Sequence, residues 1–285
     1  MPRPRVSAIS FLNTAPLMWD FERTPLGREY DISYTIPSLC AEALRSGAAD
    51  IGLIPAVTYF SIPNLVILPD VCIAAKDAVR SILLIARKPL EEVETVAADV
   101  SSRTSVVLCD LLLRRWFPAN AKGAPREFTR AEPDLDAMLA AHDAALLIGD
   151  SALRVDATRY GVFDLAAEWR RMTGKPFVFA FWAVRAEALQ PNMPAHFRLS
   201  RDHGLQPASI DVLAREWAPR VGISEEAVRG YLTESISFQL DAENLAGLHL
   251  FLRYAAEERL LPPAPELGFL GLANSDSPAV HRGKY

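Results

Sequence analysis

Strand-length apolar segments alternate with short helices along most of this chain, and that alternation is what most limits its fold. The first series of predicted strands comprises residues 5–11, 31–36, 50–55, 65–68 and 79–86. Between the second and third lies a predicted helix, Pro37–Ser46, which has Pro at its first position and Gly47 just past its end. A second series begins at Thr95–Asp99 and continues with a helix over 106–116, a helix over 134–141 and a strand over Ala144–Ile148. Such alternation predicts an α/β protein with mostly parallel strands.

The chain is long enough for two lobes, because 285 residues exceed the usual size of one domain. A charged segment after residue 87 indicates a first crossing between lobes, and the long apolar segment 173–184 indicates the return. We therefore expect lobe 1 to comprise 1–87 and 183–285, with the C-terminal helices packed on it, and lobe 2 to comprise 88–182. Two connections of this kind create a ligand cleft between the lobes.

Charge and hydropathy argue against nucleic acid and membrane partners. The net charge is −5, and Lys and Arg are scattered rather than grouped. No apolar run approaches the roughly eighteen residues that span a bilayer. The first five residues, MPRPR, lead straight into a strand without an apolar export segment, so we expect a cytoplasmic protein. The partner expected is a small molecule, and the sequence leaves the oligomeric state open.

Cysteine and histidine spacing argues against a metal site. Cys40, Cys72 and Cys109 lie more than thirty residues apart in apolar settings, which is typical of buried reduced thiols. The five histidines form no H-x-x-x-H or H-E-x-x-H pattern.

Polar residues gather where predicted strands and helices meet. Ser10 and Asn13 follow the first strand, where open α/β sheets bind ligands, although Asn-Thr-Ala-Pro is also an ordinary turn sequence. The hydroxyl-rich segment 101–105 precedes a helix, where it serves either as an N-cap or as a seat for a carboxylate that Arg103 also grips. Asp150 follows another strand and either accepts hydrogen bonds from a ligand or, as we favour, caps the helix that starts at Ser151.

Several segments together resemble one known family. These are ISFLNTAPL at 9–17, PSLCAE at 37–42, DIGLIP at 50–55, SSRTS at 101–105, LIGD at 147–150, GKPFVFAFWA at 174–183 and YLTESISF at 231–238. In order and spacing they resemble the chorismate dehydratases of the futalosine route to menaquinone, over nearly the whole chain. The resemblance implies a two-lobed fold like that of type II periplasmic solute-binding proteins. It also implies dehydration of chorismate to 3-[(1-carboxyvinyl)oxy]benzoate without a metal or organic cofactor.

The resemblance assigns catalytic roles to two residues. Asn13 matches the proposed catalytic amide of the family, and Ser81 matches a serine that lines the same site. A serine inside an apolar strand also has an ordinary role, which is to hydrogen-bond to nearby backbone. The expected substrate-binding residues are Ser10, Ser38, Pro55, Ala56, Val57, Ser102, Arg103, Thr104, Ser105, Gly149, Asp150 and Phe179. No His or Glu lies in the Ser10–Asn13, Ser38, 55–57 or Ser81 segments, so we expect the enolpyruvyl carboxylate of chorismate to act as the base.

Three other functions fit the same sequence. A non-catalytic cytoplasmic binding or sensor protein for small carboxylates would share the fold. The dihydroxynaphthoate synthases of the same pathway resemble this fold, but they open with a Cys-Pro-Asn-Asp type of turn and use a histidine base. A paralogue that dehydrates another cyclic acid is the third.

Overall fold

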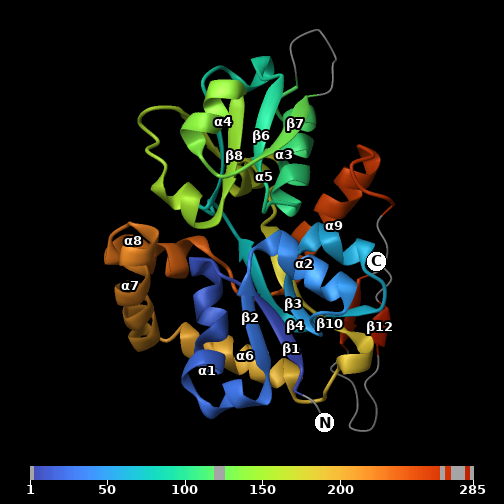
Figure 1. Cartoon of the computed structure of the whole chain (residues 1–285). Helices are drawn as coiled ribbons and strands as arrows, with labels where there is room; N and C mark the ends of the chain where they lie inside the picture. Colours follow the sequence, from blue (N-terminus) through green and yellow to red (C-terminus); the bar gives the residue numbers. More distant parts are fainter. Residues whose placement is uncertain (1–2, 119–125, 264–266, 271–279, 283–285) are drawn as a thin grey trace.

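The protein consists of two α/β lobes, one above the other (Figure 1). This is a computed structural model, and it describes residues 3–118, 126–263, 267–270 and 280–282. The division into two lobes, each with its own sheet, confirms the fold class expected from the alternation of strands and helices.

The first lobe is built on a sheet with the order β12-β11-β4-β10-β3-β1-β2 in the described part of the chain. The strands are β1 (Arg5–Ile9), β2 (Asp31–Thr35), β3 (Ile51–Pro55), β4 (Leu65–Ala75), β10 (Phe177–Arg185), β11 (Gly268–Leu270) and β12 (Val280–Arg282). Strand β1 runs parallel to β2 and β3, whereas β10 runs antiparallel to β3 and β4. Strand β3 is buried at every position and β10 at all but its last, which explains their unbroken apolar sequences.

Helices and short 3₁₀ turns surround this sheet. The helices are α1 (Trp19–Arg23), α2 (Pro37–Ser46), α6 (Met193–Gly204), α7 (Pro207–Val221) and α8 (Glu225–Gly230). The 3₁₀ helices are η1 (Leu12–Met18), η2 (Pro25–Glu29), η3 (Ala56–Ser61) and η6 (Ala186–Ala188). Helix α2 begins and ends where its sequence predicts, because Pro37 starts it and Gly47 ends it in the left-handed conformation.

The second lobe has its own sheet, with the order β7-β6-β8-β5-β9 in the described residues. The strands are β5 (Ile82–Ala86), β6 (Thr95–Asp99), β7 (Glu127–Ala131), β8 (Ala144–Ile148) and β9 (Gly161–Asp164). The helices are α3 (Thr104–Arg115), α4 (Leu135–Ala141) and α5 (Leu165–Thr173), with the 3₁₀ helices η4 (Leu90–Glu92) and η5 (Gly149–Arg154).

The pairing of the strands places the boundaries between the lobes earlier in the chain than the expected positions, 87/88 and 182/183. Strand β5 pairs with β8 and β9 of the second sheet, so the chain has crossed before residue 82. Strand β10 pairs with the first sheet from Phe177, so the chain has returned by then. The charged segment after residue 87 is a loop within the second lobe, not the crossing. Both misplaced strands are apolar, and local sequence does not say which sheet an apolar strand joins.

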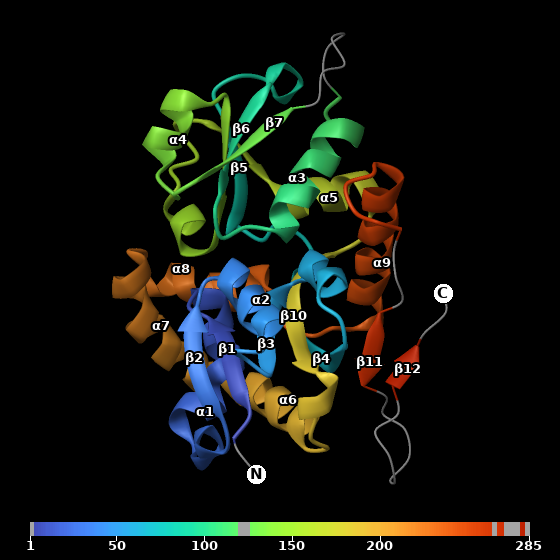
Figure 2. The same ribbon diagram turned by 45° about the vertical axis from the view of Figure 1, so that its right-hand side comes forward.

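The C-terminal helices do not pack on the first lobe alone. Helix α9 (Ala242–Glu257) lies beside both lobes (Figure 2). Its end is tied to α3 of the second lobe by Arg115, which bonds Glu257 and Glu258 at 2.8 Å each and lies over the ring of Tyr254. The C-terminal helices thus pack on the first lobe as expected, and α9 in addition bridges to the second lobe.

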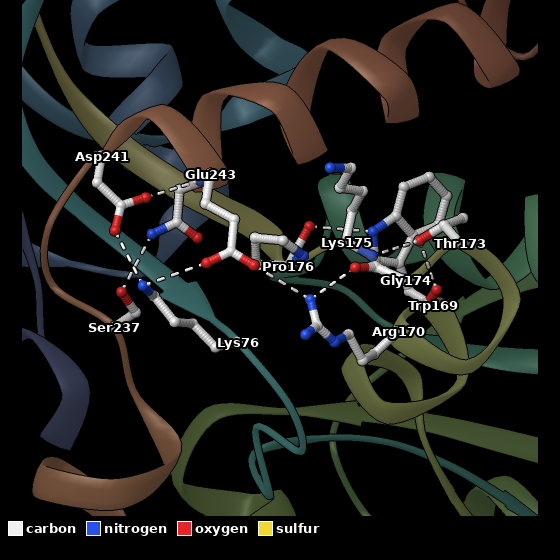
Figure 3. Close-up of polar contacts among 11 residues, drawn as sticks. Lys76, Trp169, Arg170, Thr173, Gly174, Lys175, Pro176, Ser237, Asp241 and Glu243 are labelled. Atoms are coloured by element: carbon white, nitrogen blue, oxygen red, sulfur yellow. Dashed lines mark hydrogen bonds and ion pairs between the residues drawn. The ribbon is translucent and has the colours of Figure 1, made fainter.

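The start of α9 is also tied to both crossings between the lobes (Figure 3). Glu243 bonds Lys76, just after β4, at 3.4 Å, and Arg170 of α5 at 3.2 Å. Close by, the indole nitrogen of Trp169 donates to the carbonyl of Pro176 at 3.0 Å. Helix α9 thus restrains both of the segments that connect the lobes.

The cysteines match their sequence-based expectation. All three cysteines are free and buried, and burial raises the pKa of the Cys40 thiol to about 12. Within the described ranges, no helix combines the length and the apolar character needed to cross a bilayer.

Candidate functional site

A cavity of about 50 Å³ lies where the two lobes meet. The first lobe contributes Asn13, Pro55 and Phe179 to its lining, and the second contributes Gly149 and the segment 101–105. Isoleucines from both lobes complete an otherwise apolar wall. An apolar cavity with a few polar groups on opposite sides is the usual form of a small-molecule site.

Asn13 is held in the cavity wall by the turn that follows β1. The chain passes through extended Phe11 into η1, and the Leu12 amide donates to Asp150 Oδ1 of the second lobe at 3.0 Å. The Asn13 side chain is only 9% exposed, and its Oδ1 accepts a 3.4 Å hydrogen bond from Thr14. Asn13 is therefore both a turn residue and a polar group of the cavity.

The start of α3 carries no side-chain cap from its N-cap residue, Arg103, in the described structure. The expected caps are engaged elsewhere or unused: Ser101 donates to Asp99 at 2.6 Å, and Thr104 accepts from the Val57 amide of the first lobe at 3.4 Å. The Ser102 hydroxyl is buried and has no hydrogen-bond partner among the described residues. Of the two alternatives for this segment, capping by Ser101, Ser102 or Thr104 is not seen in the described residues, and this helix start is open to an anion.

Ser102 and Arg103 also line a larger groove outside the cavity, of about 800 Å³. Ser38 and Val57 lie in this groove, together with Arg45 and Arg130, and not in the cavity. The two residues at the start of α3 thus connect the inner cavity to a groove that contains several arginines.

Gly149 and Asp150 lie at the end of β8. Gly149 lines the cavity at φ +65°, and its amide donates to the Ser81 carbonyl at 2.8 Å. Asp150 neither caps the helix at Ser151 nor lines the cavity; it accepts the Leu12 amide from the other lobe. Burial raises the pKa of Asp150 to about 6, against the opposing effects of the Leu12 hydrogen bond and Arg154.

Two expected binding residues point away from the cavity. Ser10 is exposed, donates to the Thr35 carbonyl at 3.3 Å and lines a separate pocket with Trp217 and Arg220. Ala56 is fully buried in η3 and is not part of the cavity lining. Neighbouring residues of an extended segment face opposite sides, so a motif match alone does not tell which of them face a ligand.

Ser81 lies directly behind the cavity wall and is completely buried. Its hydroxyl accepts a 2.8 Å hydrogen bond from the Tyr231 hydroxyl. The turn before it places Arg80 at φ +63°, with the amides of Val79 and Arg80 bound by the carboxylate of Asp164. The side chain of Ser81 therefore has a specific side-chain partner.

Sequence reasoning missed Tyr231. It stands at the start of a π-helix, Tyr231–Ser235, that continues α8, and its side chain is almost completely buried. An aromatic residue in an apolar helical pattern is typical of a core residue, so the only hint was its place in the segment 231–238. The described ranges contain no group of three or more His, Cys, Asp or Glu side chains arranged to hold a metal ion.

Comparison with solved structures identifies the fold. A protein from Archaeoglobus fulgidus superposes with a TM-score of 0.65 at 16% identity, covering 91% of this chain and 98% of that one. The periplasmic aliphatic sulphonate-binding protein SsuA from Escherichia coli superposes with a TM-score of 0.62 at 18% identity, covering 92% and 94%. At these identities the likeness concerns the fold alone, which is that of periplasmic binding proteins, as expected.

Comparison of sequences identifies the family. A chorismate dehydratase from Thermus thermophilus is 31% identical over 255 residues, which cover 83% of this chain and 89% of that protein. The family model described as menaquinone biosynthesis matches residues 4–257. The chain therefore belongs to the menaquinone biosynthesis family.

Proposed function

We propose that this protein is a chorismate dehydratase, which converts chorismate to 3-[(1-carboxyvinyl)oxy]benzoate and water. The observation that carries the proposal is the 31% identity with the Thermus thermophilus chorismate dehydratase over most of both chains. The lining of the cavity between the lobes, apolar with polar groups on both sides, has the chemistry that a ring with two carboxylates requires.

The reaction requires little from the protein except orientation and charge stabilisation. Loss of the C3 proton and of the C4 hydroxyl makes the ring aromatic, and the two leave together as water. The ring double bond links C3 to the C1 carboxylate, so negative charge develops on that carboxylate as the proton leaves. Fixed hydrogen-bond donors aimed at this charge lower the barrier.

The site offers such donors from both lobes. We assign one carboxylate of chorismate to the uncapped start of α3, where the Ser102 hydroxyl is buried and has no hydrogen-bond partner in the described part of the chain. Asn13 faces the same cavity from the first lobe, and its amide can donate to the substrate. Phe179, 5% exposed, provides an apolar surface for the ring.

We propose that the substrate supplies its own base. Ionisable side chains are rare in the cavity lining, where Arg103 is a cation and cannot accept the proton. The enolpyruvyl group of chorismate is attached to C3 through its ether oxygen, which brings its carboxylate close to the proton to be removed. The enzyme would then contribute orientation, which is worth several orders of magnitude in rate for well-placed groups.

We further propose that the reaction is a step of the futalosine route and takes place in the cytoplasm without an organic cofactor. This rests on the sequence resemblance described above.

Incubation of the purified chain with chorismate, followed by mass detection, tests the proposed function. The expected product is lighter than chorismate by one water. Tight binding of chorismate without turnover would instead indicate a sensor, and release of pyruvate would indicate a lyase of another kind.

Asn13→Ala tests the role of the cavity amide. We expect kcat to fall by about 100-fold to 1000-fold, the usual effect of removing one donor from a charge-stabilising site. Asn192→Ala is the matched control, because that amide lies in the turn before α6 and contacts His196. Full turnover by the Asn13 variant would refute a catalytic role for Asn13.

A further inference from the structure

The phenol of Tyr231 contacts Ser81, one of the two residues to which catalysis is assigned. Its oxygen is 2.8 Å from the Ser81 hydroxyl, and both side chains are almost completely buried. Burial raises the pKa of Tyr231, while hydrogen bonding to Ser81 and to Asn13 opposes the rise. Tyr231 therefore holds the Ser81 side chain by a direct hydrogen bond.

The direction of this hydrogen bond is fixed by the chemistry of the phenol. The buried phenol keeps its proton because burial raises its pKa, and a phenol O–H is more acidic than an alcohol O–H, so Tyr231 donates and the Ser81 oxygen accepts. The hydroxyl proton of Ser81 must then point elsewhere, and donation by Tyr231 polarises that O–H bond and makes it a stronger donor.

Both ends of the contact are held by the backbone. Tyr231 begins a π-helix, an irregularity that is common at functional sites. Ser81 follows the left-handed Arg80, and Asp164, which fixes that turn, also caps α5 by accepting from Ala166 and Ala167. The Ser81 amide plane is fixed as well, because its carbonyl accepts from Gly149 in the cavity wall.

We propose that Tyr231 is a positioning residue that directs the Ser81 hydroxyl toward the substrate. This rests on the proposed function, because it acts through a residue assigned to that reaction. Neither Tyr231 nor Ser81 lines the cavity in this closed form, and Tyr231 acts on the substrate through Ser81.

The test is a double-mutant cycle on the full chain. We expect Tyr231→Phe to lower kcat about tenfold, the rate equivalent of one buried hydrogen bond, and to leave KM nearly unchanged. In a Ser81→Ala background the same substitution should have almost no further effect on kcat. Tyr30→Phe is the matched control: it also removes a buried hydroxyl, bonded to His196 at 2.8 Å, at the far end of the first lobe.

A merely structural tyrosine would give a different result. Its loss is expected to lower the melting temperature, as is the loss of the Tyr30 hydroxyl in Tyr30→Phe. Its effect on kcat would be the same with and without Ser81. Equal effects of Tyr231→Phe on kcat in both backgrounds overturn the proposal. If Tyr231→Phe does not fold, ¹³C labelling of the tyrosine rings provides a second measurement. The Tyr231 signal should move on product binding in the wild type and stay fixed in Ser81→Ala, and movement in both proteins overturns the proposal.

Failure of the proposed function is recognised separately. If the wild type binds chorismate without turnover, chorismate dehydration is refuted, and the same cycle is measured on Kd. If Tyr231→Phe weakens chorismate binding only when Ser81 is present, positioning by Tyr231 is supported. If the losses of affinity from Tyr231→Phe and Ser81→Ala are additive, positioning is overturned. A wild-type chain that neither converts nor binds chorismate overturns both proposals.

Discussion

At the residue scale, Gly149 shows how closely the lobes approach each other at the site. A Cβ added there would lie 2.7 Å from the ring of Phe11, which belongs to the other lobe. The position also has φ +65°, a conformation that side chains other than glycine adopt only with strain. Two independent reasons therefore require glycine at this point in the cavity wall.

Gly149→Ala should lower both stability and activity. Comparison with Gly174→Ala separates the effect of backbone strain from that of the clash with Phe11. Gly174 has φ +70° but nothing within 4 Å of an added Cβ. We expect Gly174→Ala to destabilise by about 1–2 kcal/mol from backbone strain alone. Gly149→Ala should add a further loss of about 1–3 kcal/mol from the clash with Phe11. Equal losses of unfolding free energy in denaturant melts would contradict the packing argument.

Asp150 predicts a pH dependence of stability. Because burial raises its pKa to about 6, the native state binds this proton more tightly than the unfolded chain does. The stabilisation is complete below the unfolded pKa of about 4 and is lost as the pH rises through 6. In Asp150→Asn, whose amide oxygen can still accept from Leu12, we expect a melting temperature close to that of the wild type at pH 4 and above it at pH 8.

Asp143→Asn is the control with the opposite sign. Burial raises the pKa of Asp143, but Lys88 and the amides of Glu94 and Thr95 outweigh that effect and hold the pKa at about 2. Its stabilisation is present above the unfolded pKa of about 4 and is lost only as the pH falls toward 2. We therefore expect the melting temperature of Asp143→Asn to be lower than that of the wild type at pH 8. A melting temperature of Asp150→Asn below that of the wild type at pH 8 would show that burial does not dominate at Asp150.

At the element scale, α9 owes its position to Gly247. A Cβ at this residue would lie 2.1 Å from the carbonyl oxygen of Pro176, the group that also accepts the indole of Trp169. The helix therefore packs with its backbone directly against the segment by which the chain returns to the first lobe.

Gly247→Ala should push α9 away from that crossing. In an exposed helix the substitution would add up to about 1 kcal/mol of stability, but here we expect a net loss of about 1–3 kcal/mol from the clash. Gly230→Ala at the end of α8 is the matched control, because its nearest atoms are 3.9 Å away on the flexible side chains of Arg80 and Glu234. A Gly247 variant as stable as the Gly230 variant would contradict the packing.

Local sequence predicted single elements well where a physical signal marks them. Helix α2 is marked by Pro37 and Gly47, and β3 and β8 by unbroken apolar runs. The role of the hydroxyl groups at the start of α3 was harder to predict. Ser101 bonds Asp99, and Thr104 bonds the Val57 amide of the other lobe; neither partner is marked by a sequence pattern. Tyr231 was missed for the same reason, since its partner lies 150 residues away.

At the scale of the whole molecule, the cavity is too small for the proposed substrate. At about 50 Å³ it holds roughly three to five waters. Contacts that cross between the lobes close it, among them Leu12 with Asp150 and Val57 with Thr104. We infer that the lobes separate to admit chorismate and turn about the two crossings beside α9.

Small-angle X-ray scattering tests this separation. We expect the free protein to have a larger radius of gyration than this structure, and addition of the product to reduce it. A radius that matches this structure both with and without product would contradict opening of the lobes. The alternation of elements predicted two lobes and a cleft, but it could not predict how far the cleft is closed, because closure depends on single contacts between residues far apart in the chain.

The order of strands in the two sheets also bears on how the chain folds during synthesis. In the first sheet β10 lies between β3 and β4. The strands synthesised by residue 75 therefore cannot form this sheet until β10, which ends at residue 185, has left the ribosome. All strands of the second sheet that the structure describes are synthesised by Asp164. Although domains usually fold in order from the N-terminus, here we expect the inserted lobe to fold first and the lobe that begins the chain to fold around it.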